Sequence, residues 1–310
     1  MQVTWPSYTQ PDLPIRPDRT STRRTTWSPA PPGRKATADG WLNRALPAAP
    51  GGRISPVRAV SLGTELARSL RGHNDALAVD NLNDFQVRDP QGASTFESMY
   101  AKASDKVLNA TGRETFEAMK MMQSIRKQRY TPVNGAKYPN GRFGRSLMQI
   151  AQLIKSGVGL EVAFTDARGW DTHVNEVGAK PATGQLANLL GNFAEALAAF
   201  HQDLDHRMAD VSVVTMSEFG RTAKENGTRG TDHGHANVMF AFGGGIKGGK
   251  VYGDWPGLEP EQLYEERDLN LTTDFRDVLG ELVTRHLGNR HLANVFPGYT
   301  QPKFRGLVAV

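Results

Sequence analysis

The sequence predicts an α/β fold, and three consecutive segments carry that prediction. Residues 160–165 and residues 211–216 are short apolar runs bounded by polar residues, which is typical of buried strands. Between them, residues 185–208 repeat apolar side chains at i, i+3 and i+4, the period of a helix. A strand–helix–strand unit of this length is a crossover connection. We therefore expect the two strands to be parallel and to be neighbours, or nearly so, in one sheet.

The segments before this unit supply further strands and helices. Residues 57–62 and 76–79 are short apolar runs that we predict to be strands or segments that touch the core. Residues 95–129 carry aromatic, methionine and aliphatic side chains at helical spacing, so we predict a helical region there. Its methionines are expected to fill gaps in the core.

The remaining elements follow from glycine and proline punctuation. Residues 130–144 are rich in both and predict a loop, whereas residues 145–155 predict a helix that ends at Gly157. Residues 238–242 predict a third strand, and residues 274–287 predict a closing helix.

Composition excludes several classes of protein. The chain has 310 residues and no cysteine, so it forms no disulfide, iron–sulfur cluster, thiolate zinc site or cysteine nucleophile. Any metal must therefore be held by histidine or carboxylate side chains. The apolar runs are only a few residues long, against the roughly 20 that a transmembrane helix needs, so we expect no membrane span.

The net charge of +5 is concentrated near the start of the chain. Residues 1–40 contain six basic and three acidic residues, with seven of the 18 prolines and no apolar period. Such a segment cannot bury enough surface to offset its ordering entropy, so residues 1–36 are predicted to be a disordered basic tail. We assign residues 37–300 to a single α/β domain and residues 301–310 to a C-terminal tail. Elsewhere the chain shows no basic cluster interleaved with aromatic residues, which argues against nucleic acid as a partner.

Three polar clusters are expected at the carboxyl ends of the strands, where the loops of an open α/β sheet converge. Residues 169–173 follow the first strand of the crossover, residues 217–222 follow the second, and residues 230–235 precede the third. Six side chains in these clusters are candidate metal ligands: Asp171, His173, Glu218, Asp232, His233 and His235.

This oxygen and nitrogen donor set suits one or two divalent cations, namely Zn²⁺, Mn²⁺ or Mg²⁺. Arg221 is positioned to clamp an anionic oxygen through its guanidinium group.

Each candidate also has a structural interpretation. Asp171 suits a turn or a cap, Glu218 suits a loop-locking ion pair with Arg221, and Asp232 suits a hydrogen-bonded pair with a histidine. Asp232 is also a candidate for orienting a neighbouring histidine ligand from behind. The glycine-rich residues 243–249 lack the Lys-Ser/Thr ending and the following helix of a phosphate loop, so we expect no nucleotide site there.

At these residues the chain resembles the domain-of-unknown-function family 1501, a bacterial family placed with the alkaline phosphatase and sulfatase superfamily. Seven blocks carry the resemblance: residues 40–44, 169–173, 217–222, 230–236, 253–258, 272–276 and 295–298. The resemblance implies an alkaline-phosphatase-like α/β/α sandwich with a mostly parallel sheet, a bimetallic site and a small phosphate or sulfate ester as substrate. It also implies an exported, periplasmic location. We find no signal peptide in the sequence, so without the resemblance the location is unknown or cytoplasmic.

The chain departs from the superfamily pattern in two places. Residues 215–219 resemble its Thr-Ser-Asp-His element with Glu218 in place of Asp and Phe219 in place of His. The first strand, with its Gly-Gly-x-Asp motif and the Ser/Thr nucleophile of that region, has no counterpart here. We interpret residues 1–35 as an out-of-frame or wrong-start segment, the competing interpretation being a genuine disordered arm.

The sequence therefore predicts a metal-dependent, hydrolase-like protein, with ester hydrolysis expected of intact relatives, and it leaves open whether this truncated chain is active or inactive. The alternative is a non-catalytic, exported cell-envelope binding or scaffold protein with the same fold.

Overall fold

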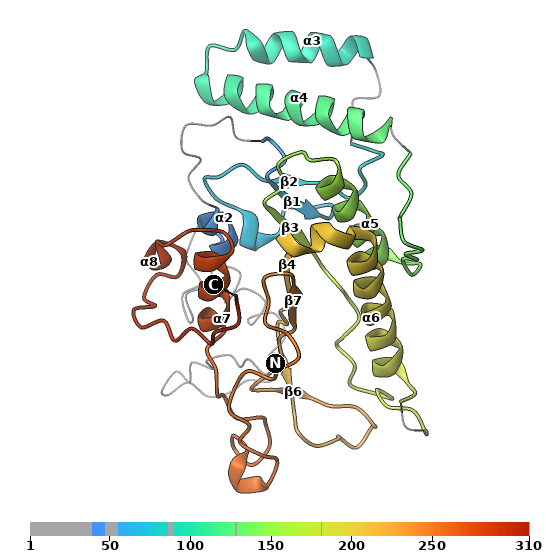
Figure 1. Cartoon of the computed structure of the whole chain (residues 1–310), viewed down its shortest axis with the longest axis vertical. Coiled ribbons are helices and arrows are strands. Elements are labelled where there is room, and N and C mark those ends of the chain that lie inside the picture. The colour runs from blue at the N-terminus through green and yellow to red at the C-terminus, as the bar shows by residue number, and fades with distance from the viewer. Residues whose placement is uncertain (1–38, 47–54, 86–89, 128, 181, 310) are drawn as a thin grey trace. The chain divides into compact units, whose positions relative to one another are not determined.

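The computed structural model describes most of the chain from residue 39 onward (Figure 1). The described ranges are residues 39–46, 55–85, 90–127, 129–180 and 182–309. They form two compact units, which we call the parallel-sheet unit and the C-terminal unit. The parallel-sheet unit contains the described residues of Ala48–Ala167 and Glu195–Asp205, and the C-terminal unit contains residues 39–46, Arg168–Ala194 and the described residues of His206–Val310. The predicted tail, residues 1–36, lies outside the described residues.

A three-stranded parallel sheet forms the centre of the parallel-sheet unit. Its strands are β1 (Ala59–Leu62), β2 (Leu77–Ala78) and β3 (Val162–Thr165), in the order β2-β1-β3. Val60 lies opposite Leu77 on one side and Ala163 on the other. All four residues of β1 are buried, as a central parallel strand covered on both faces requires. The predicted α/β class is therefore confirmed, as are the strands expected in these three segments.

The helical region predicted for residues 95–129 consists of two helices. These are α3 (Pro90–Ala101) and α4 (Lys106–Arg126). The chain breaks between them because the Asp105 Oδ1 accepts the Leu108 backbone N–H at 3.0 Å and starts a new helix. The two helices lie close together at Gly112, where a Cβ would lie 2.5 Å from the Cβ of Tyr100.

The helix after the predicted loop is α5 (Arg142–Lys155), which begins three residues earlier than predicted. Its apolar residues Leu147, Ile150 and Leu153 are buried on one face. It ends as predicted, because Gly157 adopts a φ of 63°.

The long helix α6 (Gln185–Leu204) has residues in both units. The sequence predicts that it continues to residue 208, but it ends at Leu204. Asp205 adopts a φ of 52°, which a helix cannot accommodate, and a 3₁₀ segment, η2 (Asp205–Asp210), follows.

The C-terminal unit contains two small antiparallel sheets. In one, β4 (Ser212–Val214) pairs with β7 (Ala241–Gly243). In the other, β5 (Gly220–Arg221) pairs with β6 (His233–Gly234).

The expectation that the strands flanking α6 are parallel neighbours is therefore wrong for the described residues, since β3 pairs with β1 whereas β4 pairs with β7. One backbone hydrogen bond extends the β4–β7 ladder, from the Thr215 N–H to the Phe240 carbonyl, and the Gly244 N–H beyond the ladder donates to the Met208 carbonyl of η2. The third strand is confirmed, but shifted toward residue 243.

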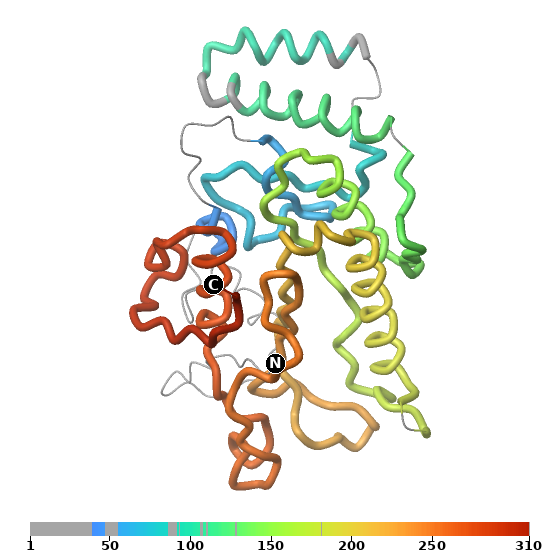
Figure 2. Tube along the Cα trace, in the orientation of Figure 1, coloured from blue at the N-terminus to red at the C-terminus, as the bar shows by residue number. Residues whose placement is uncertain are grey.

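The core of the C-terminal unit is built on α7 (Phe275–Arg285), the predicted closing helix. Asp274 caps it by accepting the Arg276 backbone N–H. Two short helices pack with it, α2 (Trp41–Ala45) and α8 (Leu292–Val295). Trp41 of α2 stacks on Phe296 with ring centroids 5.7 Å apart. Figure 2 shows how the two ends of the described chain, blue and red, meet in this core.

The predicted C-terminal tail packs into the same core. Leu307 and Val308 are buried, and the Leu307 carbonyl accepts the Lys247 backbone N–H. No helix of the described residues is both long enough and apolar enough to span a membrane.

Candidate metal centre

The β5–β6 pair brings two of the three predicted polar clusters together. Arg221 lies directly opposite His233, and Gly220 lies opposite Gly234. Glycine is required at position 234, because a Cβ there would lie 2.1 Å from the Arg221 carbonyl oxygen. Beyond the pair, the Thr222 N–H donates to the Asp232 carbonyl at 3.0 Å. Residues 217–222 and 230–235 thus form one local structure.

The third cluster, residues 169–173, packs onto the loop that precedes β6. The His173 carbonyl accepts the Asn226 Nδ2 at 3.0 Å and the Thr228 Oγ1 at 2.8 Å. The approach is so close that a Cβ at Gly230 would lie 2.2 Å from the same carbonyl oxygen. The C-terminal unit therefore assembles all three clusters, as the sequence predicts, although through antiparallel strands and loops and not through the edge of a parallel sheet.

Three of the six predicted ligands converge on one point: Asp171, His173 and His233. The Asp171 Oδ1 lies 2.7 Å from the His233 Nε2 and 3.0 Å from the His173 Nε2. One ligand atom of each residue lies within 4.8 Å of the others, and no other such group of three occurs among the described residues. The side chains of Asp171, His173 and His233 are 44%, 41% and 18% exposed, so solvent reaches the cluster.

These separations fit a metal ion. With bonds of about 2.1 Å, the ligand atoms of a tetrahedral centre lie about 3.4 Å apart. The two contacts of the Asp171 Oδ1, at 2.7 and 3.0 Å, are somewhat shorter, and all three ligand atoms lie within 4.8 Å of one another. Two imidazoles and one carboxylate leave a coordination position open, as catalytic sites of this kind do.

Asp232 lies behind this cluster and is not part of it. Its Oδ1 lies 3.2 Å from the His173 Nδ1, on the side of the ring opposite the Nε2 that faces Asp171. Both carboxylates accept only, so in the metal-free chain the proton of a neutral His173 ring lies either toward Asp232 or toward Asp171. A cation at the Nε2 would select the form in which the Nδ1 donates to Asp232. The structure thus has the arrangement in which a carboxylate orients a histidine ligand.

Both carboxylates favour their ionised forms. Burial raises the pKa of Asp171, but the hydrogen bonds and charges of His233 and His173 outweigh it and hold the pKa below its ordinary value. The pKa of Asp232 is also lowered, first by the hydrogen bond from Asn226 and then by that from His173. Ionised carboxylates are the form that binds a cation.

Arg221 connects two of the clusters. Its guanidinium donates to the Thr231 carbonyl at 2.6 Å and also to the Trp170 carbonyl. It also lies over the ring of Phe219, 4.8 Å from the centroid. The Arg221 guanidinium, which the sequence predicts to bind an anion, therefore donates two of its hydrogen bonds to the backbone of the site.

The other two predicted ligands lie outside the triad. Glu218 is exposed, and His235 stacks on Tyr264 with ring centroids 3.8 Å apart. Two residues of the site, Asn226 and Thr228, are not among those predicted from the sequence. Their signal is a polar Asn-Gly-Thr turn, which is common in loops of every kind.

The glycine-rich segment does not form a phosphate loop. The backbone N–H groups of Gly244, Ile246, Lys247 and Gly248 all donate to backbone carbonyls.

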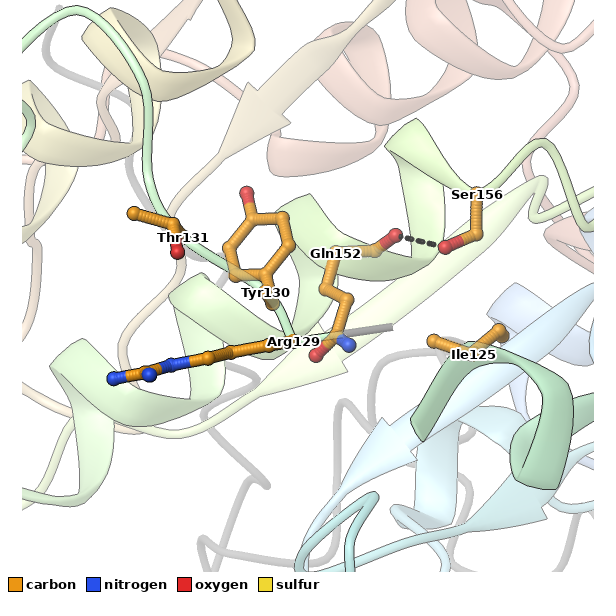
Figure 3. A pocket seen from close by; sticks show the side chains of 6 residues that line it. All are labelled: Ile125, Arg129, Tyr130, Thr131, Gln152 and Ser156. Atoms are coloured by element: carbon orange, nitrogen blue, oxygen red, sulfur yellow. Dashed lines mark hydrogen bonds between the residues drawn. The ribbon is translucent and has the colours of Figure 1, made fainter. Parts of the chain in front are cut away.

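A hollow of about 220 Å³ lies in the parallel-sheet unit (Figure 3). Its lining residues are Ile125, Arg129, Tyr130, Thr131, Gln152 and Ser156, and none of them is a predicted site residue. The Ser156 hydroxyl donates its proton to the Gln152 backbone carbonyl.

Comparison with known proteins identifies the family. The family model described as "Protein of unknown function (DUF1501)" matches residues 16–294. No curated protein and no solved structure matches the chain. The match spans far more than half of the 310 residues, and it includes all three clusters of the site. The chain therefore belongs to the DUF1501 family of proteins of unknown function.

Proposed function

We propose that this chain is a metal-dependent, hydrolase-like protein of the alkaline phosphatase and sulfatase superfamily, with an α/β/α sandwich related to theirs. The proposed substrates are small phosphate or sulfate esters, and the proposed location is outside the cytoplasm. The observation that carries the proposal is the convergence of Asp171, His173 and His233, whose ligand atoms lie within 4.8 Å of one another.

The donor set supports Zn²⁺ or Mn²⁺ more strongly than Mg²⁺. Two imidazole nitrogens and one carboxylate oxygen suit a borderline cation, whereas Mg²⁺ prefers oxygen donors throughout. With Glu218 and His235 outside the cluster, the described residues support one ion and not two. When bound, the cation would supply Lewis-acid polarisation of an ester oxygen.

The chain's own residues hold this chemistry in place. Asp171 contacts both histidine rings, so it sets the distance between them. Asp232 fixes the orientation of the His173 ring. Arg221 ties the loop of Asp171 to the loop of His233 through the carbonyls of Trp170 and Thr231.

The test is a calorimetric titration with Zn²⁺ and with Mn²⁺, beside a screen of phosphate and sulfate esters. We expect the wild-type chain to bind one ion and His173→Ala and His233→Ala to lose that binding. His235→Ala is the matched control, since His235 stacks on Tyr264 outside the triad. Equal loss in all three variants, or no binding by the wild type, contradicts the proposal.

A second candidate is a metal-binding protein without turnover, which serves as a binding or scaffold protein of the cell envelope. The engagement of Arg221 with two backbone carbonyls favours it, because that guanidinium is then not available as an anion clamp in the form predicted. Stoichiometric metal binding without hydrolysis of any ester in the screen would support this candidate over the first.

A further inference from the structure

The side chain of Asn226 is the centre of a hydrogen-bond network behind the metal-ligand triad. Its Nδ2 donates to the His173 carbonyl at 3.0 Å and to the Asp232 Oδ1 at 3.2 Å. Its Oδ1 accepts from the backbone N–H groups of Thr228 at 2.9 Å and Gly230 at 3.1 Å. The Thr228 hydroxyl lies 2.8 Å from the same Oδ1 and shares its one proton between this oxygen and the His173 carbonyl. One amide side chain therefore joins the loop before β6 to the segment that carries Asp171 and His173.

The oxygen and the nitrogen of this amide contact different parts of the site. The acceptor oxygen only shapes the loop of residues 226–230. The donor nitrogen reaches the oxygen of Asp232 that also meets the His173 Nδ1. An amide nitrogen donates and does not accept, so this contact fixes where the Asp232 carboxylate lies.

The bonds form a chain that ends at the triad. Asn226 holds Asp232, Asp232 faces the Nδ1 of His173, and the His173 Nε2 faces the Asp171 Oδ1 at 3.0 Å. The exposed fraction of the Asp232 side chain is 60%, so the carboxylate needs a fixed partner to stay in register with the ring. Asn226 is that partner, and its hydrogen bond is also the largest cause of the lowered pKa of Asp232.

We infer that Asn226 is a positioning residue for the Asp171–His173–His233 cluster and acts on it through Asp232. This inference rests on the proposed metal centre. Partners that orient a histidine ligand from behind contribute about 10- to 100-fold to metal affinity. Asn226 acts one bond further out, so its effect requires the carboxylate of Asp232.

The decisive variant is Asn226→Asp. It keeps an acceptor oxygen for Thr228 and Gly230 and replaces the donor nitrogen that faces Asp232 and the His173 carbonyl. We expect Zn²⁺ binding to weaken about 10- to 100-fold by calorimetry. Thr228→Val is the matched control, because it removes the hydroxyl that lies 2.8 Å from both the Asn226 Oδ1 and the His173 carbonyl and that does not contact Asp232. We expect it to change the affinity less than about threefold.

A double-mutant cycle separates positioning from loop stability. On the Asp232→Ala background, Asn226→Asp should change Zn²⁺ affinity less than about twofold, since the residue through which it acts is gone. The inference is overturned if the loss of Zn²⁺ affinity in the double variant equals the product of the losses in Asn226→Asp and Asp232→Ala. It is also overturned if Thr228→Val weakens Zn²⁺ binding as much as Asn226→Asp does. Either result would mean that Asn226 acts only on the loop.

A second readout does not depend on metal binding. Nitrogen-15 NMR of the metal-free chain, at an alkaline pH where imidazoles are neutral, reports which nitrogen of His173 carries the proton. Because Asp171 and Asp232 compete for the ring proton, we expect a larger fraction of the Nδ1–H form in the wild type than in Asn226→Asp. A wild type that binds no Zn²⁺ would remove the proposed function, whereas identical NMR spectra in the two proteins would remove this inference.

Discussion

The imidazole of His233 lies flat against the ring of Phe219, with centroids 4.3 Å apart and an interplanar angle of 17°. The Nε2 of the same imidazole lies 2.7 Å from the Asp171 Oδ1. Stacking fixes the plane of the ring, and the hydrogen bond fixes its rotation within that plane. Phe219 thus holds the ring of a candidate ligand in place.

Replacement of this phenylalanine should weaken metal binding. Phe219→Leu keeps an apolar side chain but removes a stacked pair worth about 0.5–1.5 kcal/mol. We expect Zn²⁺ affinity to fall about 2- to 10-fold, measured by calorimetry. Tyr264→Leu is the control, because Tyr264 stacks on His235 outside the triad. An equal loss in both variants would mean that the aromatic rings support the unit in general and not His233.

Arg221 is expected to act on the architecture of the site before it acts on any anion. Arg221→Met leaves the Thr231 and Trp170 carbonyls without their charged donor. Since hydrogen bonds from charged groups contribute about 1.5–3 kcal/mol, we expect the free energy of unfolding to fall by about 2–4 kcal/mol in urea denaturation. Arg221→Lys should recover little of it, because an ammonium group cannot reproduce the planar fork. If Arg221→Met is as stable as the wild type but binds anions less tightly, Arg221 acts as the anion clamp that the sequence predicts.

The parts of the fold that the sequence predicts well are those with local causes. The helix α7 follows from its own apolar period and from the Asp274 cap. The end of α5 follows from Gly157, which adopts the positive φ that glycine tolerates. The break at Asp105 and the end of α6 at Asp205 were missed, because an aspartate inside a helical pattern is compatible with both continuation and termination.

Strand pairing could not be predicted in the same way. A strand's own residues determine that it is buried, but its partner depends on contacts distant in sequence. The segments of β4 and β7 are therefore both predicted as strands, whereas their antiparallel pairing with each other is not. The crossover rule pointed to β3, and it fails here because the described β4 shares no ladder with β3.

The candidate site shows the same division. Residue type and clustering select six candidate ligands, since few other side chains bind divalent cations. Three of them, Asp171, His173 and His233, lie together in the structure, and the sequence does not distinguish these three from the rest. The place of Asp232 behind a histidine is one of the interpretations that the sequence offers. The turn of Arg221 toward backbone carbonyls is not, because the direction of a side chain depends on the three-dimensional structure. Asn226 had no chemical signal of its own, because its effect depends entirely on what its amide meets in three dimensions.

The C-terminal segment should depend on one buried carboxylate. Glu281 of α7 is fully buried and accepts the backbone N–H groups of Arg305, Gly306 and Val308, each at 2.9 Å. Glu281→Gln replaces one acceptor oxygen by a donor that faces an N–H group. We expect the free energy of unfolding to fall by about 2–4 kcal/mol, measured by urea denaturation. Glu261→Gln, at an exposed position, should change it by less than about 0.5 kcal/mol.

The stability of the parallel-sheet unit should fall at both ends of the pH scale because of a cluster around Asp203. This carboxylate is fully buried and accepts the hydroxyls of Tyr130 and Tyr138, at 2.5 Å and 2.8 Å, and the ammonium group of Lys155. Burial raises the pKa of Asp203, but these hydrogen bonds outweigh it and hold the pKa below its ordinary value of 3.8. Burial, followed by the hydrogen bond and charge of Asp203, raises the pKa of both tyrosines above their ordinary value of 10.0.

The signs of these shifts define the pH window. A lowered carboxylate pKa contributes stability that is present at neutral pH and is lost as pH falls below about 3.8. A raised tyrosine pKa contributes stability that is present below pH 10.0 and is lost as pH rises above it. We expect the thermal midpoint to be nearly constant between these limits, and Tyr138→Phe to flatten its alkaline decline. Ser156→Ala, which removes a hydroxyl that does not titrate, should leave the decline unchanged, and an unchanged decline in Tyr138→Phe would contradict the assignment.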